Sequence, residues 1–425
     1  MLSSLFQNKY LRKLSTVLSG ALLSQLIPVL ASPLLSRTYS PFAFGYHAPF
    51  IAICTILATF FSLSFDSALL VAESDDDIWG LLYIICILSC LTSALLFILL
   101  AIFKQSIAII FSFNTHVFDL YLIPEYVFQT IIYLSLNNVY IRFGAFRQVT
   151  QIKVSMSLMV TLCNIGGMLL SDNESGLIVS QVIGYVLLLL IQIPVVFSLI
   201  AKSSSSQRWN MTSIKQLFLK YVQFPKYHMP GNIVNTLSLQ LPPILINSIL
   251  GANIAGYYNM TNRVLALPTA AISNALADVF KNDAFTEQVE YGHFKYAYNR
   301  TLKFLLASGV PFFIAIFFFS PVFFELVFGD QWALSGYMSQ YMVLMYALKY
   351  VAVPLGFSLI VVKEFKLNLR IQILLLLGIA MIYLVFRNTS GMWQALITAL
   401  TALFSVFYAI IIVLSYRLAR RNLGH

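Results

Sequence analysis

The sequence predicts an all-α, multi-pass membrane protein, and three observations support this prediction. Of the 425 residues, 59% are apolar and only 10% are charged, whereas about a quarter of the residues in soluble domains are charged. Apolar runs long enough to cross a bilayer, which takes about 20 residues, recur along the whole chain. Lys and Arg concentrate in every second segment between these runs, as in membrane proteins of defined orientation.

Twelve apolar runs bounded by charge, Gly or Pro are predicted to be transmembrane helices, of which the fifth and eleventh are short and the fourth is polar. They cover 14–36, 48–72, 78–103, 117–141, 154–170, 177–200, 227–250, 254–280, 301–320, 337–362, 371–386 and 391–416. The first run is longer than the apolar part of a secretory signal and carries Pro28 and Pro33. It is therefore interpreted as a membrane span.

The distribution of positive charge orients the chain. With a cytoplasmic N-terminus, 21 Lys and Arg residues fall in cytoplasmic segments, and only Arg37, Lys104 and Arg387 fall outside. The remaining two, Arg263 and Lys349, lie within spans. This bias predicts that both termini are cytoplasmic, and it accounts for the formal net charge of +10 without a nucleic-acid partner.

A Ser-rich, basic segment at 201–226 divides the twelve runs into two sets of six. The prediction is a six-helix lobe at 1–200, a cytoplasmic linker with an amphipathic helix near 207–224, and a second six-helix lobe at 227–425. At an offset of 211 residues, Gly45-Tyr46 aligns with Gly256-Tyr257. Six spans per half predict a parallel repeat with its pseudo-two-fold axis along the membrane normal, as in transporters.

The sequence contains no arrangement typical of an enzyme. It has no Gly-rich phosphate loop, no paired His with metal-ligand spacing, no Ser/His/Asp set and no sizeable soluble domain. We therefore expect neither catalytic residues, a metal site nor a cofactor. The four cysteines fall within predicted spans and are expected to pack as small apolar residues.

Two cations lie near the middle of predicted spans. Arg263 is nine residues past Ile254, and Lys349 is twelve past Tyr337, so both lie roughly 14–18 Å along their helices. A charge at this depth costs about 2.5–3.5 kcal/mol on insertion scales. Either each cation pairs with a helix carbonyl or an acid such as Glu125, or both line a water-filled cavity for an anionic passenger.

Amides and hydroxyls surround Arg263 in the sequence, at a density that suits sugar hydroxyls, although hydrogen bonding between helices explains several equally well. The predicted cavity residues are Arg263, Lys349, Asn232, Asn235, Gln240, Asn259, Asn262 and Arg37, with Thr236, Ser238, Asn247 and Thr261 nearby. The acids that could exchange H⁺ or Na⁺ are Glu125, Asp119 and Asp66, with Asp278 as a further candidate that, like Asp66, better fits a headgroup-level acid.

Three stretches carry a resemblance to a known family. They are "LSRTYSPFAFG" at 35–45, "FPKYHMPGNIVNTLSLQLPPILI" at 224–246 and "AGYYNMTNRVLALP" at 255–268. With the twelve-span layout, they resemble the Wzx-type O-antigen and polysaccharide-unit flippases of the MATE-like (MOP) exporter superfamily. One departure is "SLSFDSALLV" at 62–71, where Ser64 and Asp66 stand in place of the Arg and Glu of many relatives.

The resemblance implies two six-helix lobes that open alternately to either side of a bacterial inner membrane. It implies that the cargo is an undecaprenyl-diphosphate-linked oligosaccharide, such as an O-antigen unit of lipopolysaccharide, moved from the cytoplasmic to the periplasmic leaflet. A polysaccharide polymerase and a chain-length regulator are the implied protein partners. The drive would then be an ion gradient, consumption of the cargo outside, or both.

Three alternatives remain at this stage. A MATE-type, ion-coupled exporter of drugs or metabolites would share the fold, but a net positive cavity disfavours a cationic cargo. A membrane glycosyltransferase or polymerase needs a large outer loop, and those near 104–116 and 321–336 are short. A membrane scaffold has no use for intramembrane Arg and Lys.

Overall fold

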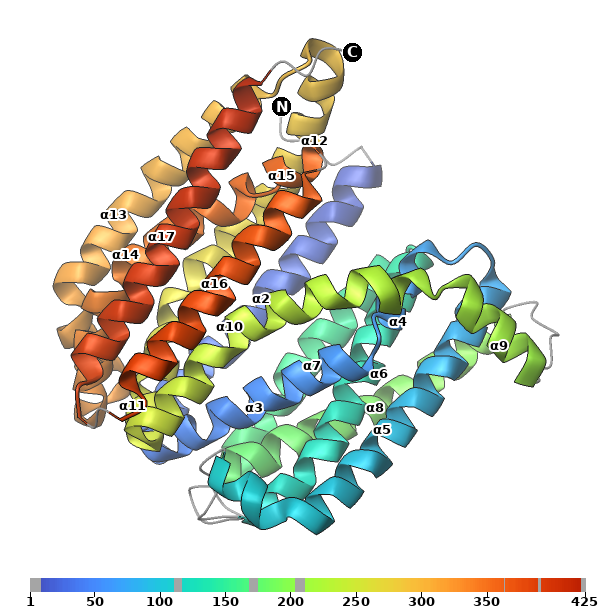
Figure 1. Cartoon of the computed structure of the whole chain (residues 1–425), viewed down its shortest axis with the longest axis horizontal. Helices are drawn as coiled ribbons and strands as arrows, with labels where there is room; N and C mark the ends of the chain where they lie inside the picture. The colour runs from blue at the N-terminus through green and yellow to red at the C-terminus, as the bar shows by residue number, and fades with distance from the viewer. Residues whose placement is uncertain are drawn as a thin grey trace. The chain divides into compact units, whose positions relative to one another are not determined.

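Nearly every described residue of the computed structural model lies in a helix, and no described residue forms a strand (Figure 1). The structure describes residues 9–110, 117–167, 175–202, 211–362, 364–388 and 391–421. The longer helices are α2 (Lys9–Thr38), α3 (Pro41–Phe61), α5 (Asp75–Ile110), α6 (Leu122–Arg142), α7 (Phe146–Gly166), α8 (Gly176–Lys202), α9 (Met211–Lys220), α10 (Met229–Leu250), α11 (Ala252–Leu265), α12 (Asn274–Tyr291), α13 (Lys295–Phe328), α14 (Ala333–Leu355), α16 (Phe365–Phe386) and α17 (Trp393–Arg420). The all-α prediction is confirmed.

Seven helical segments among the described residues are long and apolar enough to span a membrane. They are Pro41–Phe61, Asp75–Phe103, Phe224–Leu250, Lys295–Phe328, Asp330–Val361, Phe365–Phe386 and Trp393–Arg420. The other five predicted spans coincide with α2, α6, α7, α8 and the α11–α12 pair. The chain is a multi-pass membrane protein, and the count of twelve spans stays a prediction.

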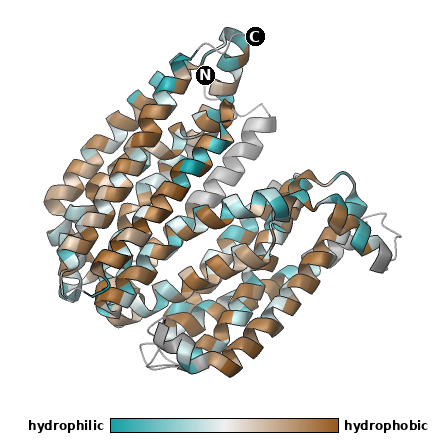
Figure 2. Ribbon diagram, viewed as in Figure 1, coloured by the Kyte–Doolittle hydropathy of each residue, from teal (hydrophilic) through white to brown (hydrophobic). Residues whose placement is uncertain are grey.

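The outward faces of these helices are apolar, as a lipid environment requires. Brown, hydrophobic segments dominate α5, α13 and α16 in Figure 2. On α13, Phe318, Phe319 and Leu326 are more than 60% exposed. Such continuous apolar exposure would make a water-soluble protein aggregate, and it is satisfied by acyl chains.

The chain divides into two compact units. The N-terminal unit comprises Met1–Ala31 and Tyr46–Gln240, and the C-terminal unit comprises Ser32–Gly45 and Leu241–His425. The end of α2 and the start of α3 therefore belong to the C-terminal unit. The ranges that the sequence predicts for the two lobes stay a prediction.

Several predicted boundaries differ from the structure; the second span, for example, is predicted at 48–72, whereas α3 ends at Phe61. The fifth span was placed at 154–170, whereas α7 already begins at Phe146 and ends at Gly166; residues 168–170 lie outside the described ranges. The cause is a tight turn at Gly144, whose φ of 64° allows α6 to be followed almost at once by α7. Lys153, predicted in a loop, therefore lies within a helix. Of the helix predicted near 207–224, residues 207–210 lie outside the described ranges, and the helix within the remaining residues is α9 (Met211–Lys220). A π-helical turn at Phe224–His228 then leads into α10.

The eighth predicted span, 254–280, is interrupted. Helix α11 ends at Leu265, Pro268 follows, and a π-helical turn at Thr269–Ser273 joins it to α12. Pro268 cannot donate a backbone hydrogen bond, which explains the break. Discontinuous helices of this kind line binding sites in transporters.

Within the C-terminal unit, α13, α14 and α17 pack side by side (Figure 1). Their buried faces form a core that includes large aromatic side chains. Tyr346 and Tyr350 of α14 and Tyr298 of α13 are almost fully buried in it. Segment Ser32–Gly45 is fastened to this unit through Trp332, whose indole N–H donates to the carbonyl of Ser36 at 2.8 Å. The hydroxyl of Ser36 in turn donates to the carbonyl of Phe328 at 3.0 Å.

Helices α3 and α11 touch through two glycines in a reciprocal contact inside the C-terminal unit. A Cβ atom on Gly45 would overlap the carbonyl oxygen of Ala252, and a Cβ atom on Gly256 would overlap the carbonyl oxygen of Pro41. The two pairs are related by the same 211-residue offset that aligns the halves of the sequence. Small residues let helix backbones approach this closely, which is a common way of packing helices in membranes.

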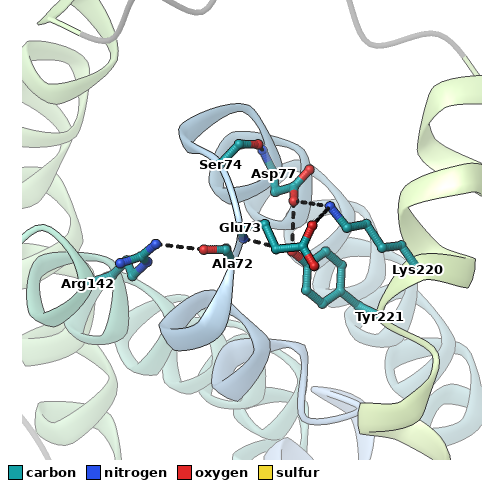
Figure 3. A network of polar contacts seen from close by, with 7 residues as sticks. All are labelled: Ala72, Glu73, Ser74, Asp77, Arg142, Lys220 and Tyr221. Atoms are coloured by element: carbon teal, nitrogen blue, oxygen red, sulfur yellow. Dashed lines mark hydrogen bonds and ion pairs between the residues drawn. The ribbon is translucent and has the colours of Figure 1, made fainter.

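A polar network fastens α9 to the loop before α5 in the N-terminal unit (Figure 3). The Lys220 ammonium lies 2.7 Å from carboxylate oxygens of both Glu73 and Asp77, and the hydroxyl of Tyr221 donates to Asp77 at 2.8 Å. The hydrogen bond to Asp77 raises the pKa of Lys220 most, and the hydrogen bond to Glu73 is the next largest cause. Helix α9 is therefore joined both to the segment before α5, at Glu73, and to the first turn of α5, at Asp77.

We predict that Gly45→Ala and Gly256→Ala each destabilise the protein by about 1–3 kcal/mol, because the added methyl overlaps a backbone oxygen that cannot rotate away. The measurement is thermal unfolding of the purified protein. Gly231→Ala in α10 is the matched control, since a Cβ there meets nothing within 4 Å. If Gly45→Ala melted at the same temperature as the wild-type protein, α3 and α11 would be able to move apart at no cost in stability, which would contradict the prediction.

We predict that Lys220→Ala raises amide hydrogen exchange in α9 roughly two- to fivefold, which corresponds to the loss of a partly exposed ion pair. Lys215→Ala is the control, because Lys215 lies on the same helix, is exposed and has no ion pair with any described residue. Equal exchange in the two variants would contradict a fastening role for Lys220.

Candidate functional site

Arg263 lies in the last turn of α11, one turn before the break at Pro268. At helical spacing, Arg263 falls on the same face of α11 as Ala252, Gly256 and Asn259. The amide of Asn259 donates to the carbonyl of Phe44 at 3.3 Å, within the C-terminal unit. The contact with α3 therefore fixes the rotation of α11 and with it the direction of the arginine.

The helix end stabilises the guanidinium only in part. A cation in the last helical turn gains about 0.3–1 kcal/mol from the helix dipole, and up to about 2 kcal/mol when partly buried. This is less than the cost of about 2.5–3.5 kcal/mol for Arg at the centre of a span. Among the described residues, no carboxylate forms an ion pair with Arg263.

The structure brings Asn262 and Lys349 to the same aromatic side chain. The hydroxyl of Tyr346 donates to the side-chain carbonyl of Asn262, and the ammonium of Lys349 lies 5.3 Å from the centre of the Tyr346 ring. Tyr346 is only 2% exposed, so its position is fixed by packing. Helices α11 and α14 are thereby joined through a neutral residue, and Lys349 also has no ion pair with a described carboxylate.

The other predicted cavity residues are distributed over both units. Arg37 is exposed at the end of α2 in the C-terminal unit. Asn232, Asn235 and Gln240 lie on the part of α10 that belongs to the N-terminal unit. Asn232 donates to the hydroxyl of Ser64 at 3.2 Å, and Asn235 is exposed. The cavity as a whole stays a prediction, while Asn262 and Lys349 meet at Tyr346 within the C-terminal unit.

The acids predicted for ion coupling have different surroundings. Glu125 lies in the first turn of α6, and its exposed side chain accepts a hydrogen bond from Gln129 at 2.6 Å. Asp119 is 6% exposed and accepts from Ser175 at 2.5 Å. Asp66 accepts from Ser67 at 3.4 Å. The side chain of Asp278 lies outside the described side chains.

A cavity that the sequence did not predict, lined by both polar and apolar side chains, lies within the N-terminal unit. It has a volume of about 320 Å³ and is lined by Ser24, Gln25, Tyr133, Lys153, Met156, Ser157, Val160 and Gln181, which come from α2, α6, α7 and α8. Sequence reasoning missed it because Lys153 was counted as a loop charge. The available signal was the spacing of Lys153, Ser157 and Val160, which places them on one face of a helix.

Comparison with known proteins gives a family and a fold. Residues 34–335 match the model of the family described as polysaccharide biosynthesis protein. One curated relative, an uncharacterized membrane protein in the cps region of Klebsiella pneumoniae, is 22% identical over 235 residues, which is 55% of this chain and 47% of the relative. The match thus covers about half the length of that relative.

Solved structures share the fold at low sequence identity. An inward-facing MATE-family multidrug resistance transporter of the MOP superfamily superposes with a TM-score of 0.63 at 14% identity, covering 96% of this chain and 94% of that one. The lipid II flippase MurJ, in an inward closed conformation, gives 0.66 at 14% identity, covering 94% and 86%. The MATE multidrug transporter DinF-BH gives 0.65 at 14% identity, covering 96% and 94%.

These structural likenesses establish the fold, which this chain shares with the three proteins. The family match extends over well over half of the chain, and it includes α3, the reciprocal glycine contact and Arg263. The chain therefore belongs to the polysaccharide biosynthesis protein family.

Proposed function

We propose that this protein is a flippase that moves a lipid-diphosphate-linked oligosaccharide unit from the cytoplasmic to the periplasmic leaflet of a bacterial inner membrane. The observation that carries the proposal is the pair of cations in the helical bundle of the C-terminal unit. Arg263 and Lys349 have no ion pair with any described residue. Tyr346 links Lys349 to Asn262, the residue that precedes Arg263 in the chain.

A diphosphate supplies the missing negative charge. The guanidinium of Arg263 can donate two parallel hydrogen bonds to phosphate oxygens, whereas the Lys349 ammonium acts as a point charge. The amides of Asn259 and Asn262 supply groups that suit sugar hydroxyls. Charge complementarity thus holds the diphosphate, and the break at Pro268 gives α11 and α12 a place to bend during alternating access.

The family match and the flippase among the structural relatives support this proposal. We propose a transporter without catalytic residues, both of whose termini are cytoplasmic because Lys and Arg concentrate on that side. An undecaprenyl-type carrier is the proposed lipid, and a polymerase with its chain-length regulator are the proposed partners outside.

The alternative is an ion-coupled exporter of drugs or metabolites. The structural relatives include multidrug transporters as well as a flippase. Because all of them share one fold, the fold does not distinguish the two functions. The charges distinguish the two. Two unpaired cations repel the cationic compounds that such an exporter would carry, and the repulsion is strong in a poorly hydrated bundle.

We predict that Arg263→Ala reduces surface polysaccharide to the level of a strain lacking the gene, while Arg263→Lys retains part of it, because the charge survives but the two-pronged geometry is lost. The measurement is surface polysaccharide in a complemented deletion strain, with membrane protein levels checked. Arg387→Ala, at an exposed helix end, is the control. Normal polysaccharide from Arg263→Ala at normal protein levels would contradict cargo binding by this residue.

We predict that Glu125→Gln removes the dependence of cargo movement on an imposed pH gradient, because an amide cannot load or release a proton. The measurement uses purified protein in liposomes with gradients of H⁺ and, separately, of Na⁺. Glu325→Gln is the matched control, since Glu325 is exposed near the end of α13. Transport by Glu125→Gln that still responds to the proton gradient would assign coupling to another acid.

A further inference from the structure

The cavity in the N-terminal unit carries one positive charge and no negative one. Lys153 is its only ionisable lining side chain apart from the phenol of Tyr133, and none of its eight lining residues is a carboxylate. Within the described ranges, Lys153 is half-buried and forms no ion pair. A half-buried ammonium in a helical bundle without a counter-ion is costly, so the cavity favours an anion.

The neutral lining groups provide further hydrogen bonding. The hydroxyl of Ser157 already donates to the carbonyl of Ser24 at 2.6 Å. Gln181 donates one of its two amide hydrogens to the hydroxyl of Tyr126 at 3.4 Å, which leaves the second hydrogen and the carbonyl. The described part of the chain provides no hydrogen-bond partner for the side chains of Gln25 and Tyr133 in this structure.

Tyrosines in tilted and edge-to-face contact hold one wall of the cavity in place. The ring of Tyr185 lies 5.0 Å from that of Tyr126 and 6.1 Å from that of Tyr133, measured between ring centres. Tyr126 and Tyr185 are 3% and 5% exposed. Because these aromatic contacts position both Gln181 and Tyr133, the polar groups are held before any ligand arrives, which lowers the entropic cost of binding.

The size of the cavity limits the ligand. About 320 Å³ is near the lower end of the range for small-molecule sites, and it suits one sugar ring rather than an oligosaccharide. A single cation, two amides and a phenol match one carboxylate and several hydroxyls. Met156 and Val160 add an apolar surface of the kind on which the C–H face of a sugar ring packs.

We propose that this cavity binds a single sugar residue bearing a carboxylate, with the carboxylate on Lys153 and hydroxyls on Gln25, Gln181 and Tyr133. Taking this sugar to be part of the transported unit rests on the function proposed above. The cavity then recognises an acidic sugar separately from the diphosphate, so that the repeat unit carried by this protein contains a uronic-acid-type residue.

The test compares two sugars that differ at one carbon. Glucuronate and glucose are titrated by calorimetry against the purified full chain in lipid nanodiscs. Since hydrogen bonds to a charged group contribute more than neutral ones, wild-type protein should bind glucuronate at least tenfold more tightly than glucose. Equal affinity for the two sugars would overturn the proposal.

Variants assign the binding to this cavity. Lys153→Met should abolish the preference for glucuronate, whereas Lys295→Met, at an exposed position in the first turn of α13, should leave it unchanged. Tyr133→Phe retains the charge of Lys153 and should weaken the binding of glucuronate and of glucose to a similar degree. This variant gives a second test if Lys153→Met does not fold. An unchanged preference in folded Lys153→Met, or unchanged affinities in Tyr133→Phe, would place the site elsewhere.

The cellular assay separates this proposal from the flippase. Suppose that wild type binds glucuronate in the cavity but that a folded Lys153→Met protein still exports normal polysaccharide. The site would then bind a free acidic sugar and not one in the cargo, which would overturn the assignment to the repeat unit. A different result would contradict only the diphosphate site. This result is glucuronate binding that depends on Lys153 together with normal surface polysaccharide in Arg263→Ala, and it would leave the acidic-sugar proposal standing.

Discussion

The close approach of α3 and α11 is the constraint on which the C-terminal unit depends. Two backbones can come this near only where neither carries a Cβ, and Gly45 and Gly256 meet this condition from opposite sides. The contact sets the rotation of α11, and helical spacing then carries Asn259 and Arg263 to the same face. The position of the candidate cation therefore follows from a steric requirement two turns away from it.

Among the described residues, three exposed cations form ion pairs with carboxylates, whereas three cations of intermediate exposure do not. Lys220 pairs with Glu73 and Asp77, Arg300 with Asp283, and Arg421 lies 3.9 Å from Glu364. Arg263, Lys349 and Lys153 have no such partner among the described residues. Pairing would have been the simplest way to lower the cost of these inner charges, so their unpaired state is consistent with a ligand that brings the negative charge itself.

Much of this architecture could be predicted from the sequence. Apolar length and charge bias predicted the helical membrane fold. The 211-residue offset aligned Gly45 with Gly256 as equivalent positions of the two halves, but it did not predict that the two glycines touch. The partner of Asn262 could not be predicted, because Tyr346 is 84 residues away along the chain and no local pattern joins them. The cavity around Lys153 was not predicted because the tight turn at Gly144 lets α7 begin two helical turns earlier than expected. A charged residue next to a span boundary fits a loop as well as a helix, so the sequence did not place Lys153 in the helix.

The contribution of Ser32–Gly45 to the C-terminal unit has a consequence for biosynthesis. Ser36 accepts its hydrogen bond from Trp332, which is synthesised 296 residues later. At elongation rates of about 5–20 residues per second, the first helix hairpin waits about 15–60 s in the membrane before its partner emerges from the ribosome. During that interval the carbonyl of Ser36 lacks its partner, although the glycine surface of α3 can already pack against α11 once residues 252–265 have been made. A chain that terminates between α11 and Trp332 therefore retains the glycine contact but lacks the hydrogen bond that fastens the end of α2.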